Sequence, residues 1–183
     1  MQLRDAVESD LPDILEIYNE VIANSTAIYS EKPVSLPDRL AWFKARQEQG
    51  YPVLVAVDGT EILGFASFGD FRAWPCYRYS VEHSVHVRAD QRGRGIGRAL
   101  LEAVISRASD LGKHVLIAGI DAENANSIKL HEGTGFTRVA HFREVGRKFD
   151  RWLDLVFMQR FLGTDASPGM APRPNPTNPG GLS

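Results

Sequence analysis

The stretch VRADQRGRGIGRAL, residues 87–100, places three glycines and three arginines within the seven positions 92–98. An alternating, strand-like run precedes it and a helix-like run follows it. Glycines let backbone N–H groups approach an anion without an intervening Cβ, and the start of a helix carries a partial positive charge. The stretch therefore predicts an anion-binding turn; the simpler alternative is a flexible strand-to-helix turn with solvated arginines.

The spacing of the glycines separates the known kinds of phosphate-binding turn. A dinucleotide fingerprint, G-x-G-x-x-G, fails because after Gly93 and Gly95 the third glycine would fall on Arg98. A nucleotide P-loop fails because no glycine is followed, four residues later, by Gly-Lys and a hydroxyl residue. What remains is R-x-x-G-x-G, formed by Arg92, Gly95 and Gly97. The arginines would supply charge for a diphosphate or a 3'-phosphate.

The runs on either side of the turn have clear periodicities. The strand over residues 79–87 alternates between two faces. One face carries Tyr79, Val81, His83, Val85 and Val87, and the other carries Ser80, Glu82, Ser84 and His86. The helix after the turn runs from Gly95 to Leu111 and is ended by Gly112.

The whole chain predicts the element order βααβββαβαββ, a mixed α/β sheet with helices packed on it. The first strand covers residues 1–6, and the first helix has Ser9 as its cap. A second helix begins at Ser35 with Asp38 three residues on, and Asp58-Gly59 joins two strands in a hairpin. The remaining elements are a buried strand over 114–120, a short helix over 126–132, and closing strands around 137–145 and 151–160.

Length and composition indicate one folded domain. With 43% hydrophobic and 24% charged residues, the 183-residue chain suits a single soluble domain over residues 1–163. Residues 164–183 contain five prolines and three glycines and predict a disordered tail. A net charge of -2 argues against general binding to nucleic acid or membrane. The N-terminus lacks a secretory signal and no segment approaches a membrane span, so we expect a cytoplasmic protein.

Two motifs resemble those of a known family. VHVRADQRGRGIGRALLEAVISRA, residues 85–108, resembles the coenzyme A diphosphate motif of the GNAT superfamily of N-acetyltransferases. NANSIKLHEGTGF, residues 124–136, resembles the second motif of that superfamily, and the likeness covers about residues 2–162. Within the superfamily, the runs YSVEHSVHV, KLHEGTGF and RWLDLVFMQR are most similar to the phosphinothricin and methionine sulfoximine acetyltransferases.

The resemblance implies a central mixed sheet whose fourth and fifth strands splay apart and admit the pantetheine arm of acetyl-CoA. It also implies a homodimer, and a general base at Glu82, which from position alone could equally be a solvated carboxylate. Backbone N–H groups near Val85 and Val87 would contact the thioester and the developing oxyanion. The expected coenzyme-binding set is Val85, His86, Val87, Arg92, Gly93, Arg94, Gly95, Ile96, Gly97, Arg98, Asn124, Asn126 and Ser127.

Three histidines raise questions of catalysis and metal binding. His131 stands where many members of the superfamily carry a tyrosine that protonates the leaving thiolate. A histidine can donate a proton near neutral pH, although this ring could equally pack beside the coenzyme. His83 and His86 form an H-x-x-H pair, but on a strand they point to opposite faces, and no cysteine or carboxylate cluster completes a ligand set. We therefore expect no metal.

Substrate selection is expected in the loop DFRAWPCYRYS, residues 70–80. Its arginines could pair with a substrate carboxylate and its aromatic rings could wall the side chain, and the same residue types suit a dimer interface. The lone cysteine of the chain lies here; such a residue is more often packed than nucleophilic. Including a tyrosine that could close the pocket, the expected substrate-binding set is Tyr29, Arg72, Trp74, Pro75, Cys76, Tyr77 and Arg78.

The resulting hypothesis is an acetyl-CoA-dependent enzyme that acetylates the α-amino group of a small amino-acid analogue such as phosphinothricin, methionine sulfoximine or methionine sulfone. One alternative keeps the fold and changes the acceptor to a protein N-terminus, a lysine or a polyamine, which would need an open, acidic groove. Another alternative is a catalytically silent coenzyme-binding module, which has no need of a carboxylate at Glu82.

Overall fold

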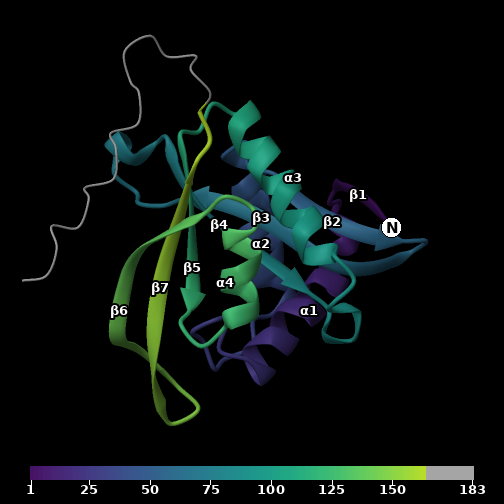
Figure 1. The fold of residues 1–183 in the computed structure, drawn as a ribbon. Coiled ribbons are helices and arrows are strands. Elements are labelled where there is room, and N and C mark those ends of the chain that lie inside the picture. The colour runs from purple at the N-terminus through teal and green to yellow at the C-terminus, as the bar shows by residue number, and fades with distance from the viewer. Residues whose placement is uncertain (164–183) are drawn as a thin grey trace, which may run out of the picture.

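The computed structural model describes residues 1–163, which form one sheet with helices on both faces (Figure 1). Within these residues the strand order is β1-β2-β3-β4-β5-β7-β6. The strands are β1 (Gln2–Asp5), β2 (Val53–Asp58), β3 (Glu61–Asp70), β4 (Ser80–Val87), β5 (Val115–Asp121), β6 (Thr137–Lys148) and β7 (Arg151–Phe161). The helices are α1 (Leu11–Asn24), α2 (Leu36–Glu48), α3 (Ile96–Asp110) and α4 (Ala125–Glu132). The predicted mixed α/β sheet and its element order are confirmed, whereas the predicted disordered tail lies outside the described residues.

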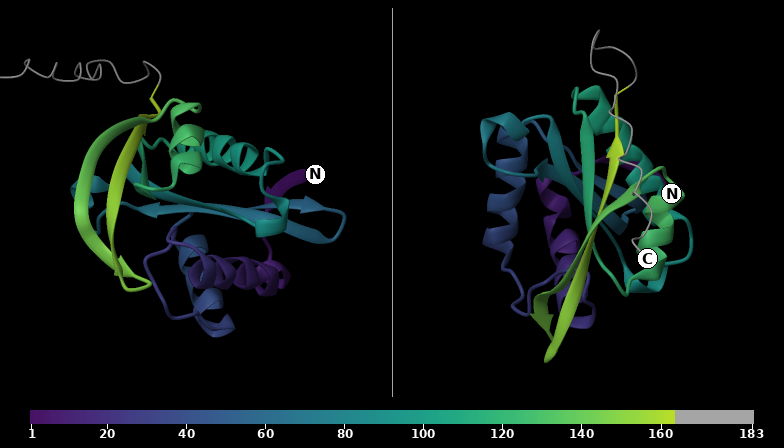
Figure 2. Two further views of the ribbon diagram at one scale, coloured as in Figure 1. Left: turned by 60° about the horizontal axis from the view of Figure 1, so that its bottom comes forward. Right: turned by 60° about the vertical axis from the view of Figure 1, so that its left-hand side comes forward.

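Helices α1 and α2 cover one face of the sheet, and α3 and α4 cover the other (Figure 2). The alternation of side chains along β2 supplies both layers: Leu54 and Ala56 pack with α3, whereas Val53, Val55 and Val57 pack with α1 and α2. A strand that is buried on both faces reads as a continuous apolar run, which is how β2 appears in the sequence.

Helix α2 begins where the sequence predicts. The Oγ of Ser35 accepts a hydrogen bond from the backbone N–H of Asp38 at 3.3 Å, and the Asp38 carboxylate accepts one from the backbone N–H of Ser35 at 3.0 Å. This reciprocal pair satisfies two backbone donors at the start of the helix. The capping prediction made from the Ser35 and Asp38 spacing is confirmed.

Helix α1 does not begin as predicted. Ser9 lies inside a short 3-10 turn, and the α-helix starts at Leu11. The Asp10 carboxylate accepts the backbone N–H of Val7 at 2.8 Å and pairs with Arg4 of β1 at 2.6 Å. The predicted Ser9 cap is therefore wrong, because the residues before α1 are held by an ion pair to a neighbouring strand and not by a local serine cap.

Strands β4 and β5 run parallel but separate after their first residues. Their paired residues are Ser80 with Val115, Val81 with Leu116, and Glu82 with Ile117. Both strands continue beyond these pairs, and β5 is paired along its length with β7 on its other side. A gap therefore opens between β4 and β5 beyond Glu82, which confirms the predicted splaying of the fourth and fifth strands.

Strands β6 and β7 form a long hairpin that curves toward the α1 and α2 layer (Figure 2). Its two-residue turn, Phe149-Asp150, has φ values of +51° and +58°. Two successive positive φ values match the twist of the adjoining strands in a short hairpin. The turn brings Lys148, the last residue of β6, to the end of α1.

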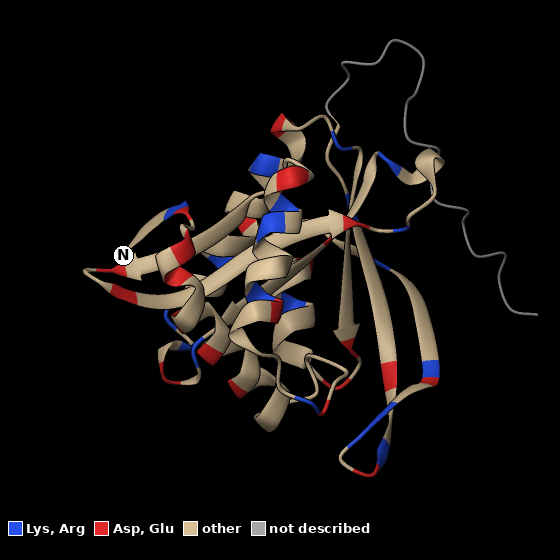
Figure 3. Ribbon diagram, turned by 180° about the vertical axis from the view of Figure 1, so that it is seen from behind, with Lys and Arg blue, Asp and Glu red and all other residues tan. Residues whose placement is uncertain are grey.

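Acidic and basic residues are interspersed over the helices and strand ends when the molecule is seen from behind (Figure 3). None of the helices in residues 1–163 combines the length and the apolar content needed to cross a bilayer. The basic residues of the turn before α3 thus form a local group, set among charges of both signs.

Candidate active site

The predicted anion-binding turn joins the end of β4 to the start of α3. Gly93 and Gly95 have φ values of +78° and +82°, a region that residues with side chains rarely adopt. A Cβ built on either glycine would meet no atom within 4 Å, so both border open space. Gly95 immediately precedes α3, whose first N–H groups have no partners within the helix. The geometry suits an anion, and anion binding itself stays a prediction.

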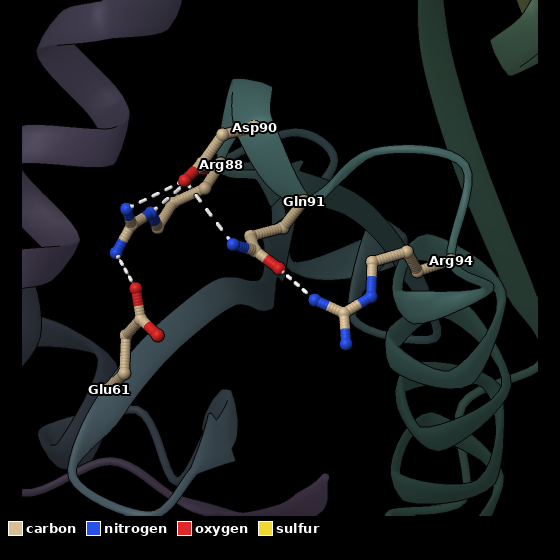
Figure 4. A network of polar contacts seen from close by, with 5 residues as sticks. All are labelled: Glu61, Arg88, Asp90, Gln91 and Arg94. Carbon is tan, nitrogen blue, oxygen red and sulfur yellow. Dashed lines mark hydrogen bonds and ion pairs between the residues drawn. The ribbon is translucent and has the colours of Figure 1, made fainter.

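A chain of polar contacts orders the turn (Figure 4). The Arg88 guanidinium contacts Glu61 of β3 and both carboxylate oxygens of Asp90, the latter at 3.1 and 3.0 Å. Gln91 donates to Asp90 at 3.2 Å and accepts from Arg94. Each exposed ion pair contributes only about 0–1 kcal/mol. Together they fix the path of the turn and hold Arg94 beside the start of α3.

Arg92 and Arg98 flank the same helix start. The Nε of Arg92 donates to the carbonyl oxygen of Val87 at 3.4 Å, and its Nη2 lies 3.5 Å from the Glu20 carboxylate of α1. The Nη1 of Arg98 donates to the carbonyl oxygen of Gly133, just after α4, at 3.3 Å. The arginines of the motif therefore connect the turn to helices on both faces of the sheet.

Alternate N–H groups of β4 face the gap between β4 and β5. The N–H of Arg88 donates to the carbonyl oxygen of Leu63 in β3, and the N–H groups of an antiparallel strand alternate in direction. The N–H groups of Val85 and Val87 consequently point toward β5, beyond the last pair at Glu82. Their direction is the one expected for contacts to a thioester in the gap.

Two predicted coenzyme-binding residues turn their side chains into the protein core. The His86 ring packs against Tyr18 and Phe65, with ring centroids 5.8 and 5.2 Å apart. Burial, together with the charge of Arg39, lowers the pKa of His86 to about 4 and keeps the ring neutral. Ile96, the first residue of α3, is buried in the hydrophobic core. Only the backbone of these two residues is placed to contribute to the turn.

The predicted pantetheine or adenine contacts gather at the start of α4, directly after β5. The Oδ1 of Asn124 accepts the backbone N–H of Ser127 at 3.0 Å, so Asn124 is the cap of this helix. The helix therefore starts at Ala125, one residue before the predicted start. Asn126 is exposed in the first turn.

His131 of α4 and His83 of β4 form a buried pair. The Nδ1 of His131 lies 2.7 Å from the carbonyl oxygen of Ser127, and because a carbonyl only accepts, this nitrogen carries the proton. In the neutral ring, Nε2 of His131 then accepts from Nε2 of His83 at 3.2 Å. The rings stack with 16° between their planes. Burial lowers the pKa of both rings, that of His83 to about 3.

Glu82 is the last residue of β4 that pairs with β5, and its carboxylate points at Gly119 of β5. A Cβ built on Gly119 would lie 3.0 Å from the Glu82 Oε1, so a glycine leaves room for the carboxylate. Burial raises the pKa of Glu82, and the charge of Arg72 opposes the rise. A carboxylate with a raised pKa is the stronger base. Gly119 was not predicted, although a glycine inside a buried strand signals a close approach.

A cavity of about 500 Å³ lies between β4 and the α1 and α2 layer. Glu82, His83 and Ser84 all line it, although His83 points to the opposite face of β4 from its neighbours. Gly119 of β5 lines it too, so the cavity extends into the gap between the strands. The other lining residues are Tyr18, Ala27, Ile28, Val34, Asp38, Arg39, Trp42, Arg46, Phe65 and His86. A second cavity of about 390 Å³, beside Arg88, does not include Glu82.

The predicted substrate-binding loop lies outside this cavity in the described chain. Trp74 is 74% exposed, and Tyr77 and the thiol of Cys76 are exposed as well. Arg72 stacks on Phe71, with its Cζ 4.1 Å from the ring centroid, and its charge reaches Glu82. The structure thus brings Arg72 toward the site and leaves Trp74, Pro75, Cys76, Tyr77 and Arg78 away from the cavity.

Tyr29 packs against the hairpin of β6 and β7. Its hydroxyl donates to the carbonyl oxygen of Asp154 in β7 at 2.9 Å, and its ring lies against Gly146 of β6. Burial, with nearby carboxylates, raises the pKa of Tyr29 to about 12, so the hydroxyl stays protonated. Tyr29 itself does not line the cavity, but its neighbours Ala27 and Ile28 do.

Lys148, which was not predicted from the sequence, holds the loop that contains Ala27 and Ile28. Only 1% exposed, it donates from Nζ to the carbonyl oxygens of Ile22, Ser25 and Ile28 at 2.6, 2.7 and 2.8 Å. An ammonium group suits the end of α1, where carbonyl groups lack partners and the helix dipole is negative. Its acceptors are backbone atoms 120 to 126 residues away, so no side-chain pattern signals the contact.

Known proteins resemble this chain over most of its length. The acetyltransferase (GNAT) family model matches residues 14–136. The L-methionine sulfoximine/L-methionine sulfone acetyltransferase of Pseudomonas aeruginosa is 54% identical over 86% of this chain and 92% of its own. The phosphinothricin N-acetyltransferase of Streptomyces coelicolor is 36% identical over 88% of this chain and 96% of its own.

Solved structures agree in fold. A phosphinothricin acetyltransferase from Sinorhizobium meliloti, in complex with acetyl-CoA, has a TM-score of 0.87 and 39% identity, covering 93% of this chain and 95% of its own. A Salmonella typhimurium acetyltransferase with its cofactor acetyl-CoA has a TM-score of 0.89 and 47% identity, covering 93% and 99%. The matched family region contains the turn before α3, the gap and α4. The chain therefore belongs to the acetyltransferase (GNAT) family and is an acyltransferase.

Proposed function

We propose that the protein transfers the acetyl group of acetyl-CoA to the α-amino group of a small amino acid carrying an oxidised sulfur or a phosphinic group. Methionine sulfone, methionine sulfoximine and phosphinothricin are examples, and the names of the relatives above support this class. The observation that carries the proposal is the cavity that spans β4. It holds Glu82 on the α1 side and extends into the gap between β4 and β5, so an amine and a thioester from opposite faces would meet there.

The residues before α3 fit the diphosphate of the coenzyme. Gly93 and Gly95 leave open space, the first N–H groups of α3 lack partners, and three arginines surround them. The N–H groups of Val85 and Val87 are donors for the thioester oxygen. When bound, acetyl-CoA supplies an activated acyl group. These residues orient it and stabilise the negative charge that develops on its oxygen.

Glu82 would act as the general base. An α-amino group is mostly protonated at neutral pH, because its pKa is about 8. The Glu82 carboxylate takes one proton from the ammonium, directly or through a water, and leaves a lone pair on nitrogen. That lone pair attacks the thioester carbon and forms the new C–N bond. The nitrogen gives up its second proton as the C–S bond breaks, and the leaving thiolate takes up one proton, so one proton is released for each acetyl group transferred.

The contacts of His131 bear on its role as the donor of the proton that the thiolate takes up. His131 must carry a proton on Nε2 to donate it, yet in the neutral ring this nitrogen accepts from His83. Donation therefore requires the imidazolium form, which burial disfavours. The same contacts suit the alternative role, in which His131 packs beside the coenzyme. The acid role stays a prediction.

Alternative acceptors fit the cavity less well. A polyamine carries further cations besides the reacting amine, and the cavity that would receive them has Arg39 and Arg46 in its lining beside the carboxylates of Asp38 and Glu82. A silent binding module would not need a buried carboxylate in the gap between two strands. We also propose that the exposed aromatic residues Trp74 and Tyr77 belong to a homodimer interface, because exposed rings gather at such surfaces.

The proposal is tested by measuring thiol release and acetyl-CoA binding with the full chain. We expect binding of acetyl-CoA, and turnover with methionine sulfone, methionine sulfoximine and phosphinothricin, but not with spermidine or a peptide N-terminus. Failure to bind acetyl-CoA would overturn the proposal at its root. Binding without turnover of any amine would instead support the silent module.

A further inference from the structure

Arg39 of α2 is a buried cation without an acidic partner. It is 5% exposed, and its Nε is buried with no hydrogen-bond partner in the described part of the chain. No carboxylate among residues 1–163 forms an ion pair with it. Its Cζ lies 3.8 Å above the Tyr18 ring and 4.6 Å from the Trp42 ring. Stacking offsets part of the cost of burial, but a buried charge is normally also paired.

Arg39 lines the same cavity as Glu82. Arg39 stacks on Tyr18, and the edge of Tyr18 meets His86 with 5.8 Å between ring centroids. Glu82 and His86 lie on the same face of β4. A ligand in this cavity can therefore present an amine to Glu82 and acceptor atoms to Arg39.

The α-carboxylate of an amino acid is not the group that reaches Arg39. It is bonded to the carbon that carries the amine, so a cation that binds it must lie close to Glu82. Arg72 is the arginine whose charge acts on Glu82. Arg46 also lines the cavity, but it is less buried than Arg39 and donates to Gln49 at 2.9 Å. The substrate side chain therefore remains for Arg39, whose planar guanidinium presents several N–H donors and matches two acceptor atoms on one sulfur or phosphorus.

We propose that Arg39 binds the side-chain oxygens of the substrate and thereby selects amino acids that end in a sulfone, sulfoximine or phosphinate group. This inference rests on the proposed function and names the residue that sets its substrate class. Such oxygens would complete the hydrogen bonding of the buried guanidinium. Methionine, which has nearly the same shape and no oxygens on sulfur, would leave it unpaired and bind poorly.

The test compares kcat/KM for methionine sulfone and for methionine in the wild-type protein, Arg39→Met, Arg39→Lys and Lys44→Met. Lys44 is an exposed cation on the same helix and serves as the matched control. We expect the wild type and Lys44→Met to prefer the sulfone. Arg39→Met should reduce that preference by about tenfold to a hundredfold, through a lower kcat/KM for the sulfone and an equal or higher one for methionine. Acetyl-CoA affinity should be unchanged. Arg39→Lys keeps the charge and loses the planar guanidinium. Its preference for the sulfone should therefore lie between that of the wild type and that of Arg39→Met.

Three other results would count against the proposed role of Arg39 in substrate selection. A wild type without preference for the sulfone, an Arg39→Met variant that keeps the preference, or equal losses for both amines would overturn the inference. If Arg39→Met fails to fold, the preference of Arg39→Lys decides in its place. If the wild type turns over neither amine, the failure is a distinct one, because it overturns the proposed function and not the role of Arg39 alone.

Discussion

The proposed reaction centre has a coenzyme side and an amine side, and the two are built in different ways. The coenzyme side is contiguous: residues 85–98 contain the amides that face the gap, the glycines with positive φ and the arginines around the start of α3. The amine side is assembled from α1, α2, β4, β5 and a loop that Lys148 fixes from more than a hundred residues away. Local backbone geometry decides where an acyl donor can be held. Packing between distant segments decides which amine can approach it.

Replacing Glu82, where the two sides meet, should give the largest effect. We expect Glu82→Gln to lower kcat by about a hundredfold to ten-thousandfold, because a general base contributes about that much. The affinity for acetyl-CoA should be unchanged. In the wild type, kcat/KM should fall on the acid side as Glu82 is protonated, at a pH above the ordinary range of a glutamate, since burial raises its pKa. This limb should disappear in the variant.

The control for this change is Glu102→Gln on the exposed side of α3, whose carboxylate lies 3.4 Å from Arg98 and lines neither cavity. Assays of thiol release at a series of pH values give kcat and kcat/KM for both variants. A Glu82→Gln enzyme that retains wild-type kcat would show that the carboxylate is structural, and the two sides would then no longer meet at this residue.

Lys148→Met should weaken the amine side and spare the coenzyme side. It leaves three carbonyl oxygens without their donor, so we expect the free energy of unfolding to fall by about 2–3 kcal/mol. The loop carrying Ala27 and Ile28 would loosen, and KM for the amine should rise while acetyl-CoA affinity stays constant. Arg147→Met removes an exposed neighbour paired only with Asp150 at 3.1 Å and should leave all three quantities unchanged. Denaturant titration and calorimetry measure the effects, and equal losses on both sides would contradict the comparison.

Gly97→Ala should have the opposite pattern, with weaker binding of the coenzyme and no effect on binding of the amine. Gly97 has ordinary helical geometry, and a Cβ there would make normal contacts at 3.6 and 3.7 Å. Alanine should therefore stabilise the free protein by up to about 1 kcal/mol. Because the new methyl group stands over the first turn of α3, acetyl-CoA affinity should drop about tenfold, roughly 1.4 kcal/mol.

Gly95→Ala provides the contrast to Gly97→Ala. It places a side chain at a φ of +82°, which should destabilise the fold by about 1–2 kcal/mol as well as weaken coenzyme binding. Titration calorimetry and thermal unfolding separate the two quantities. Wild-type acetyl-CoA affinity in Gly97→Ala would show that the coenzyme does not contact this turn.

Acid pH should lower the stability of the folded chain gradually, with a small effect for each pH unit. The pKa of buried His86 is about 4 in the folded chain, below the ordinary value of 6.5. Between these values the unfolded chain binds a proton that the folded chain does not, so stability falls as pH decreases through this window. One such group contributes at most about 1.4 kcal/mol per pH unit. Denaturant titrations from pH 7 to 4 should show a smaller slope for His86→Asn, and equal slopes would exclude this origin.

Some features of the site were predicted because a local pattern encodes them. The alternation along β4 places Glu82 and His86 on one face, and the Ser35 and Asp38 spacing predicts the start of α2. Other features have no such pattern. Arg39 and Lys148 carry no signal in the sequence that singles them out, yet both are buried in the folded chain. The Ser9 cap failed for a different, local reason, since the ion pair between Arg4 and Asp10, six residues apart, holds that helix start.

By itself the sequence determined the order of elements, the splayed strands implied by its motifs and the glycine-lined start of α3, since backbone conformation and periodicity depend on neighbouring residues. Only the tertiary structure decided that Gly119 makes room for Glu82, that Arg39 faces the amine cavity and that the loop 70–80 lies outside it. Burial and the approach of side chains from distant segments depend on how whole layers pack, and a linear pattern records only the face each residue presents.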